Sequence, residues 1–214
     1  FVHVSYLRPH PPFFAPEPYN TMYDPEAMPA RTRAATADDE GRQHPLLELL
    51  VHHPYLAAPT DDDHLAQLVA TYHGMQSEVD DQIGRLLAHL DATGEAGHTI
   101  VVVGSDHGEQ LGDHYLLHKL GYFDESYHVP LIVADPRAGR DGGRGRVVQA
   151  FTENVDVTPT ILDLIGGDVP LQCDGRSLRA WLEGTTPDDW RDAAHWEFDF
   201  RDPDGQFFEQ AFGL

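Results

Sequence analysis

The stretch Thr99-Ile-Val-Val-Val-Gly-Ser-Asp106-His107-Gly-Glu-Gln-Leu-Gly-Asp-His114 decides the fold class. Residues 99–103 are β-branched and apolar apart from Thr99, as in a strand that is buried on both faces. A glycine-flanked polar turn follows at once, and open α/β sheets place their sites at the carboxyl ends of strands. On this turn Asp106 and His107 supply an oxygen and a nitrogen donor side by side. The stretch therefore predicts an α/β fold with a metal ligated at the end of the strand.

The residues on both sides of this strand predict the neighbouring elements. Upstream, apolar residues recur at three- and four-residue intervals and predict a helix from Asp61 to about Gly94. Downstream, Pro130-Leu-Ile-Val-Ala reads as a second short buried strand. Weaker patterns predict strands at residues 1–6, 147–151 and 194–198, a helix with Pro159 in its first turn and Gly166 at its end, and a short helix within 174–182.

Composition limits the classes of partner. The chain has 214 residues, of which 41% are apolar, and 14 basic against 36 acidic residues give a net charge of −22. This balance argues against nucleic acid or an anionic membrane surface as the main partner. No apolar run approaches the ~20 residues of a membrane span. The start at Phe1 has neither an initiator Met nor a signal-peptide pattern, so we expect the chain to be part of a longer protein. Cys173 is the single cysteine, which favours a reducing compartment, and we expect the bacterial cytoplasm.

A long polar excursion covers residues 19–59. It lacks hydrophobic periodicity apart from a short apolar cluster at 46–50, which predicts one short helix. Loops of this length are usually lids, binding loops or oligomer contacts. We therefore expect the excursion either to set substrate choice or to form a homo-oligomer interface, and we expect its histidines His44, His52 and His53 to be solvated.

Two metal ligands do not complete a metal site, because a divalent ion needs four to six donors. The nearby residues that could assist are Glu109, Asp113, His114 and His118. Residues adjacent along a tight turn point in different directions, so we expect supporting or structural roles for these four. The remaining ligands are expected to come from outside this chain.

Two further side chains are candidates for binding an anion. Lys119 follows His107 by twelve residues, and its ammonium could stabilise charge on an oxygen of a tetrahedral anion; the alternative is an ordinary surface lysine. His10 lies between Pro9 and Pro11, which restrict its backbone and could fix the direction of its imidazole; the alternative is a surface histidine in a proline-rich loop.

These segments together resemble the sulfatase branch of the alkaline phosphatase superfamily. The segments that carry the resemblance are Arg8-Pro-His10-Pro-Pro-Phe, Tyr72-His-Gly-Met-Gln-Ser-Glu-Val-Asp80-Asp-Gln-Ile-Gly-Arg-Leu, Ser105-Asp106-His107-Gly-Glu-Gln-Leu-Gly-Asp-His with Lys119, and Phe151-Thr-Glu-Asn-Val-Asp156-Val-Thr-Pro-Thr-Ile-Leu. Within the branch, Asp-His at the metal motif, Cys173-Asp-Gly-Arg-Ser-Leu and Glu197-Phe-Asp-Phe-Arg-Asp resemble phosphonate monoester hydrolases, which also hydrolyse phosphodiesters and sulfate esters. The resemblance implies an alkaline-phosphatase-like α/β sandwich with a mixed, mostly parallel sheet flanked by helices, present here as a fragment.

The resemblance also implies a role for each matching residue. Asp106 and His107 ligate a single divalent ion, Lys119 contacts the leaving-group and anion oxygens, and His10 hydrogen-bonds the anion or protonates the leaving group. The histidine ligand favours manganese, with calcium or zinc as alternatives. The family's nucleophile is a formylglycine made within a Cys-x-Pro-x-Arg type motif. That motif is absent, since Cys173 lies in Gln-Cys-Asp-Gly-Arg, so the nucleophile is expected upstream of this chain.

The domain organisation and the function follow as expectations. Residues 1–186 are expected to form the C-terminal part of the catalytic domain, and residues 187–214 the start of a truncated C-terminal subdomain. The expected activity is metal-dependent hydrolysis of small anionic esters, namely phosphonate monoesters, phosphodiesters and sulfate esters. Two alternatives stay open: a sulfatase selective for one sulfate ester, and a noncatalytic fragment or binding module.

Overall fold

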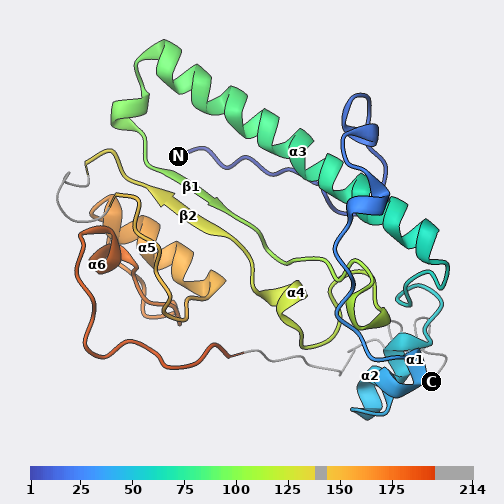
Figure 1. Cartoon of the computed structure of the whole chain (residues 1–214). Coiled ribbons are helices and arrows are strands. Elements are labelled where there is room, and N and C mark those ends of the chain that lie inside the picture. Colours follow the sequence, from blue (N-terminus) through green and yellow to red (C-terminus); the bar gives the residue numbers. More distant parts are fainter. Residues whose placement is uncertain (138–143, 196–214) are drawn as a thin grey trace, which may run out of the picture. The chain divides into compact units, whose positions relative to one another are not determined.

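The computed structural model describes residues 1–137 and 144–195. Contacts between residues divide the described chain into two compact units: unit 1 holds residues 1–94 and 107–129, and unit 2 holds residues 95–106, 130–137 and 144–195 (Figure 1). The division falls within the stretch that predicts the metal site, because Asp106 belongs to unit 2 and His107 to unit 1.

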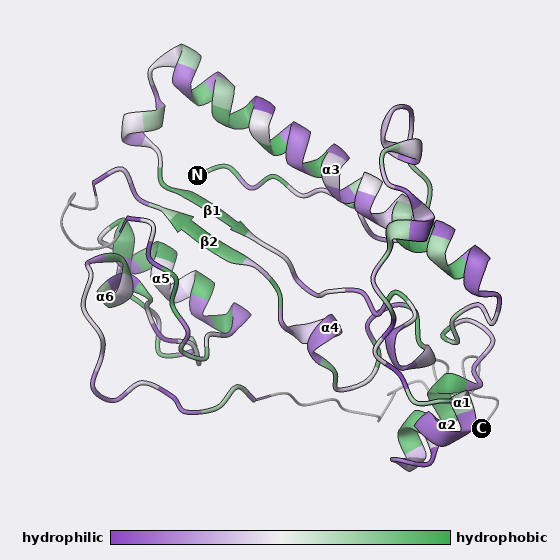
Figure 2. Cartoon of the chain, viewed as in Figure 1, coloured by the Kyte–Doolittle hydropathy of each residue, from purple (hydrophilic) through white to green (hydrophobic). Residues whose placement is uncertain are grey.

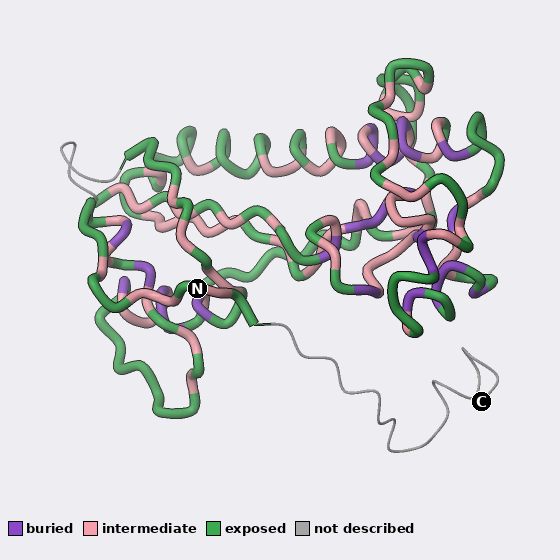
Figure 3. Tube along the Cα trace, turned by 60° about the horizontal axis from the view of Figure 1, so that its bottom comes forward, coloured by how far each residue is buried: buried purple, intermediate pink, exposed green. Residues whose placement is uncertain are grey.

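Helix α3, Asp62–Thr93, is the longest described element of unit 1, and it confirms the predicted helix. The Asp61 carboxylate accepts the His64 backbone N–H at its start, and Gly94 ends it with a φ of 76°, a conformation that favours glycine. Hydrophobic and hydrophilic residues alternate along the whole helix in Figure 2. Its buried residues nevertheless all lie in the N-terminal half, as Figure 3 shows: Leu65, Val69, Ala70, Tyr72, Gly74 and Met75.

The excursion contains four short elements. They are the 3-10 helices η1, Tyr19–Thr21, and η2, Pro25–Ala27, and the helices α1, Ala37–Gly41, and α2, Pro45–Val51. Helix α2 confirms the short helix predicted at 46–50. Both 3-10 helices contact α3, and α1 packs against α2.

Two apolar clusters form the core of unit 1. In the first, Leu47, Leu50 and Val51 of α2 pack with Leu116, and in the second, Ala58 packs with residues of α3. Part of the excursion is therefore core rather than solvated loop.

The histidines of the excursion do not all face solvent. His53 is only 8% exposed, so the expectation that it is solvated is wrong: the turn after α2 folds its ring inward, and Nδ1 bonds the Tyr55 backbone N–H. His44 accepts the Leu46 N–H and caps α2, and His52 lies 3.2 Å from the Asp38 carboxylate.

Unit 2 contains a two-stranded sheet and two short helices. Strand β1, Val101–Gly104, pairs antiparallel with β2, Leu131–Ala134, and Val101 lies opposite Ala134. Both strands were predicted. The sequence predicts a mixed sheet, and mixed sheets include antiparallel pairs. Among the described residues, the sheet consists of the antiparallel pair β1–β2. Helix α5, Val157–Leu164, follows the 3-10 helix η5, Asn154–Asp156, and packs against α6, Arg179–Leu182; η3, Ala96–His98, precedes β1.

Two of the predicted strands are wrong. Residues 1–6 and 147–151 adopt no regular structure in the described chain, and residues 1–6 are all exposed. A strand needs a hydrogen-bonded neighbour, and the described residues offer neither segment one. The strand predicted at 194–198 lies mostly outside the described residues, and the domain boundary at 186/187 stays a prediction. In the described part of the chain, no helix has the length and apolarity needed to cross a bilayer.

Candidate functional site

Two of the candidate residues stand at the two ends of one loop in unit 1, which runs from His107 to Lys119. Hydrogen bonds close the base of this loop: the Gln110 backbone N–H donates to the His118 carbonyl at 2.9 Å, and the His118 N–H donates to the Glu109 carboxylate. The side-chain amide of Gln110, which is fully buried, donates to the Ser126 hydroxyl at 2.8 Å. The returning chain thus places Lys119 beside His107.

The loop has an unusual backbone. Four non-glycine residues have positive φ: Leu111 at 52°, His114 at 53°, Tyr115 at 60° and His118 at 65°. Such angles are uncommon outside glycine and cost free energy, so they persist only where neighbouring contacts impose them. The 3-10 helix η4, Asp113–Tyr115, lies at the tip of this loop.

His107 uses both nitrogens of its ring. Nδ1 lies 2.7 Å from the Gly108 carbonyl oxygen, and Nε2 lies 2.8 Å from the Lys119 ammonium nitrogen. A carbonyl can only accept, so Nδ1 carries the proton and Nε2 presents a lone pair, which accepts from Lys119. The same tautomer is the one that binds a metal through Nε2.

His10 lies near this pair. Its ring centroid is 6.0 Å from that of His107, with the planes at 69°, and its Nδ1 is 2.9 Å from the Pro11 carbonyl oxygen. Unit 1 therefore brings together three of the four residues predicted for the site: His10, His107 and Lys119.

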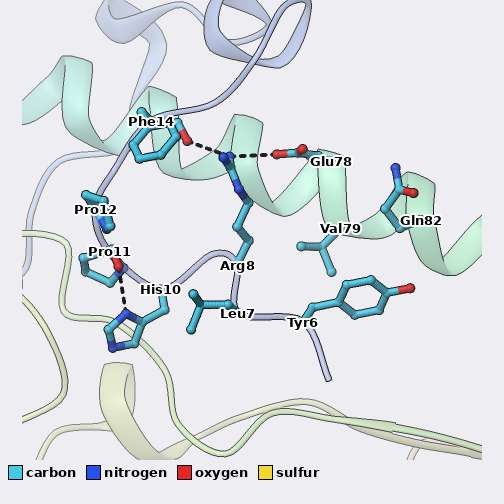
Figure 4. A pocket seen from close by; sticks show the side chains of 10 residues that line it. All are labelled: Tyr6, Leu7, Arg8, His10, Pro11, Pro12, Phe14, Glu78, Val79 and Gln82. Atoms are coloured by element: carbon cyan, nitrogen blue, oxygen red, sulfur yellow. Dashed lines mark hydrogen bonds and ion pairs between the residues drawn. The ribbon is translucent and has the colours of Figure 1, made fainter. Parts of the chain in front are cut away.

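The segment that carries His10 is fastened to α3. Arg8 donates to the Glu78 carboxylate at 2.8 Å and to the Phe14 carbonyl at 2.6 Å, as the dashed lines in Figure 4 show. Between this segment and α3 lies a pocket of about 330 Å³, lined by Tyr6, Leu7, Arg8, His10, Pro11, Pro12, Phe14, Glu78, Val79 and Gln82. The ion pair and the prolines together hold the backbone on both sides of His10.

Asp106, the fourth predicted residue, follows β1 in unit 2. The side-chain amide of Asn154 donates to the backbone carbonyls of Ser105, at 3.0 Å, and of Asp106, at 3.3 Å. Asn154 in turn is carried by η5, whose Asp156 is fully buried. The strand end that bears Asp106 is thus tied to η5.

The donors fit a divalent cation in type but are too few to hold it. Asp106 offers carboxylate oxygens and His107 a neutral imidazole nitrogen, both common metal donors. Among residues 1–137 and 144–195, no group of three or more His, Cys, Asp or Glu side chains is arranged to hold a metal. A metal at this place needs ligands from outside the described residues.

Burial biases two ionisable groups of the loop toward their neutral forms. Burial raises the pKa of the Glu109 carboxyl above its ordinary value, although backbone N–H groups lower it in part. Burial also lowers the pKa of His118.

Two residues with clear contacts to this region were missed from the sequence, Glu40 and Asn154. Glu40 accepts a hydrogen bond from His114 across 74 positions, and Asn154 reaches Asp106 across 48. Neither residue lies in a local pattern that signals such a contact.

Comparisons with known proteins identify the family of this chain. The sequence model of the family described as Sulfatase matches residues 1–167. Over 212 residues the chain is 46% identical to the multifunctional alkaline phosphatase superfamily protein PehA of Trinickia caryophylli, with 94% of the chain and 41% of that relative covered.

Two solved structures are similar along the whole chain. The phosphonate monoester hydrolase of Silicibacter pomeroyi matches with a TM-score of 0.88 and 42% identity, covering 100% of this chain and 43% of that one. The phosphonate monoester hydrolase of Agrobacterium radiobacter matches with a TM-score of 0.89 and 43% identity, covering 100% and 44%. The chain therefore spans about two fifths of the length of the relatives it matches.

Proposed function

The chain belongs to the sulfatase family, and from that premise we propose that the intact protein hydrolyses phosphonate monoesters, phosphodiesters and sulfate esters. The alkaline-phosphatase-like α/β fold predicted from the sequence is confirmed for this part of the domain. The substrate range is supported by 42% to 46% identity to two phosphonate monoester hydrolases and to a relative whose name calls it multifunctional.

The observation that carries this proposal is the contact of 2.8 Å between Lys119 Nζ and His107 Nε2, with the His10 ring 6.0 Å from that of His107. A cation and two imidazoles within one small region suit the binding of a tetrahedral anion. In our proposal Lys119 stabilises the negative charge on the oxygens of the ester, which grows on the way to the transition state. His10 protonates the departing oxygen, which removes the charge that would otherwise build up there.

Asp106 and His107 would ligate a single divalent ion together with donors from elsewhere in the intact protein; manganese is our first choice, and calcium and zinc are the alternatives. Such an ion supplies Lewis-acid stabilisation of an anionic ester. We propose that the nucleophile, a formylglycine, also lies outside these 214 residues. This chain then contributes part of the metal site and the groups that bind the anion and the leaving group.

The test compares three substrates with the intact protein: an aryl phosphonate monoester, a phosphodiester and an aryl sulfate. We expect turnover of all three, and Lys119→Ala should lower kcat by about 10²- to 10³-fold, the cost of removing one donor that stabilises a developing anion. The matched control is Arg85→Ala, because Arg85 is an exposed cation on α3 whose guanidinium donates to the Gln82 side chain. This control should leave kcat unchanged.

Each alternative has its own outcome. Turnover of the aryl sulfate alone would replace our proposal with a selective sulfatase. Absence of turnover of all three esters by a folded, metal-loaded protein would favour a noncatalytic binding module. Equal kcat values for Lys119→Ala and the unmodified protein would show that Lys119 does not take part in catalysis.

We also propose a substrate class, a compartment and an oligomeric state for the intact protein. The substrate is a small anionic ester, the compartment is the bacterial cytoplasm, and the intact protein forms a homo-oligomer. Sedimentation equilibrium of the intact protein tests the last point directly.

A further inference from the structure

We propose that the excursion, residues 19–59, is a scaffold for the site, and that Glu40 of helix α1 is a positioning residue that holds Lys119 in place through His114. This inference rests on the proposed function, because it assigns Lys119 a role in turnover. It adds a residue that contacts none of His10, Asp106, His107 and Lys119 in the described structure.

Glu40 is a carboxylate that the fold buries almost completely, with 2% of the residue exposed. One oxygen accepts from the Ala34 backbone N–H at 2.5 Å, and the other accepts from the Gln43 side-chain amide at 2.9 Å and lies 2.9 Å from His114 Nδ1. A buried carboxylate is costly unless its lone pairs are satisfied, and here three donors surround it. Glu40 is therefore fixed in position and can fix its partner.

His114 is held on several sides at the tip of the loop. Nδ1 donates to Glu40, Nε2 lies 3.6 Å from the Glu125 carboxylate, and the ring stacks on Phe123 at 3.5 Å with the planes 6° apart. Its backbone N–H donates to the Thr32 carbonyl at 2.8 Å. These contacts explain how a non-glycine residue with a φ of 53° is kept in that conformation.

The excursion binds the rest of the tip in the same way. The Tyr115 hydroxyl donates to the Ala34 carbonyl at 3.0 Å, the Ala58 N–H donates to the Tyr115 carbonyl at 2.8 Å, and the Leu117 N–H donates to the Leu56 carbonyl at 2.7 Å. The segment before α1 and the segment after α2 therefore both contact the loop within a few residues of Lys119.

The consequence for Lys119 follows from the path of the chain. Only four residues separate His114 from Lys119, and Tyr115 and His118 among them also have positive φ. If His114 loses Glu40, the tip can relax toward ordinary backbone angles, and Lys119 moves away from His107. Displacements of about 1 Å are enough to cost about 10²-fold in rate.

These contacts favour a scaffold over the two roles expected from the sequence, a lid or an oligomer interface. A lid must leave the site to admit substrate, whereas the excursion contributes buried residues of α2 to the core cluster that includes Leu116. An oligomer contact would use side chains that face outward, and Glu40 faces inward.

The test is a double-mutant cycle in the intact protein with an aryl phosphonate monoester: Glu40→Ala, Lys119→Ala and the double variant. The control is Glu48→Ala, since Glu48 is an exposed carboxylate on the neighbouring helix α2. Thermal unfolding establishes that each variant is folded at the assay temperature. A second readout does not need turnover: Lys119 is the only lysine of this chain, so its acylation by a lysine-selective reagent can be followed on one peptide by mass spectrometry.

We expect Glu40→Ala to lower kcat by about 10- to 100-fold, the usual cost of losing a supporting partner in an active site. In the metal-free protein, where Lys119 contacts His107 Nε2, it should speed acylation of Lys119 severalfold, because the amine loses this contact. In the background of Lys119→Ala, removal of Glu40 should lower kcat little further. Glu48→Ala should match the unmodified protein in both readouts.

The contrary outcomes are distinct from a failure of the proposed function. Additive losses in the cycle, or a folded Glu40→Ala protein with unchanged kcat and unchanged acylation, would overturn the positioning role. If Lys119→Ala leaves turnover intact, the proposed function fails at Lys119, while faster acylation in Glu40→Ala would still show that Glu40 positions this side chain. Should Glu40→Ala not fold, Glu40→Gln, which keeps the size and one acceptor, carries the test with a smaller expected loss of kcat and the same non-additivity.

Discussion

The Nε2 atom of His107 has one lone pair, and both Lys119 and a bound metal ion would use it. The Nδ1 proton is fixed by the Gly108 carbonyl, so Nε2 presents the only lone pair of the ring. In the described structure that lone pair accepts from Lys119. A metal ion and the ammonium therefore need the same lone pair, and each excludes the other from it.

Replacement of His107 tests its assignment as a metal ligand. We expect His107→Ala to weaken metal binding by more than about 100-fold, because loss of a ligand costs more than loss of a residue that only supports one. The measurement is metal content after dialysis against a buffered concentration of Mn²⁺. His89→Ala, an exposed histidine on α3, is the control and should keep its metal. Equal metal content in both variants would contradict the assignment.

The short helices of this chain are too short to be stable alone, and polar side chains stabilise them. Helix α1 has five residues, fewer than the roughly 12 that an isolated helix needs to be even marginally stable in water. Thr36 caps its first turn, and Glu40 ties its last turn to the loop. The 3-10 helix η5 has three residues and is anchored in the same manner by Asp156.

Ionisation of Glu40 should make stability depend on pH. Burial raises the pKa of this carboxyl, but hydrogen bonds from the Ala34 N–H, His114 and Gln43 outweigh burial, so the folded-state pKa lies below the ordinary 4.5. A lowered pKa means that the ionised form stabilises the fold above pH 4.5, and that this stability is lost as the pH falls through the lower folded-state value. His114 and Tyr122 are the other titratable groups that act on Glu40 or feel its charge.

We therefore expect the unmodified protein to exceed Glu40→Gln in free energy of unfolding at neutral pH, and the difference to shrink below pH 4.5. Urea denaturation at a series of pH values measures this difference. Glu48→Gln on α2 should show a small difference that does not change with pH. A Glu40→Gln difference that stays constant in acid would argue that size, rather than charge, holds α1.

Asp156 is the corresponding anchor in unit 2. Its carboxylate accepts both terminal nitrogens of Arg191, at 2.6 and 2.8 Å, together with the backbone N–H groups of Glu153 and Arg176, and the residue is fully buried. We expect Asp156→Ala to cost about 3 to 5 kcal/mol of stability, because it leaves a guanidinium that is only 12% exposed, and two N–H groups, without this buried acceptor. Chemical denaturation measures the loss.

The exposed Asp168, close in sequence, supplies the matched control for Asp156. Asp168→Ala should change the free energy of unfolding by less than about 0.5 kcal/mol. A similarly small cost for Asp156→Ala would mean that Glu153, which lies 2.9 Å from Arg191, can satisfy the guanidinium alone.

On the scale of the whole molecule, the sequence predicted those elements whose structure depends on residues close together in the chain. The helix at 62–93 follows from its apolar spacing and its terminal Asp and Gly, and β1 follows from a run of β-branched residues. Asp106, His107 and Lys119 are close in sequence, so their types and spacing were enough to single them out. The metal and catalytic roles of these residues and of His10 stay predictions.

What the sequence did not predict depends on contacts between distant segments. A strand at residues 1–6 has the right alternation, yet alternation cannot supply the neighbouring strand that it needs. Glu40 lies in a polar segment without period, and its partner His114 is 74 residues away. His114 lies in the metal motif, but no local signal marks Glu40 as its partner, so a single sequence cannot identify the scaffold role of the excursion.

The charge of the whole chain leads to a prediction about substrate capture. The net charge of −22 on these 214 residues repels an anionic ester over about 30 Å at an ionic strength of ~10 mM, and screening shortens this range to about 8 Å at ~150 mM. We expect kcat/KM for a singly charged aryl phosphonate monoester to rise between ~10 mM and ~150 mM NaCl, through KM and with kcat unchanged. A doubly charged phosphate monoester should respond more strongly, because the repulsion scales with its charge. A fall of kcat/KM with salt would show instead that the local field around Lys119, and not the net charge, governs the approach of the substrate.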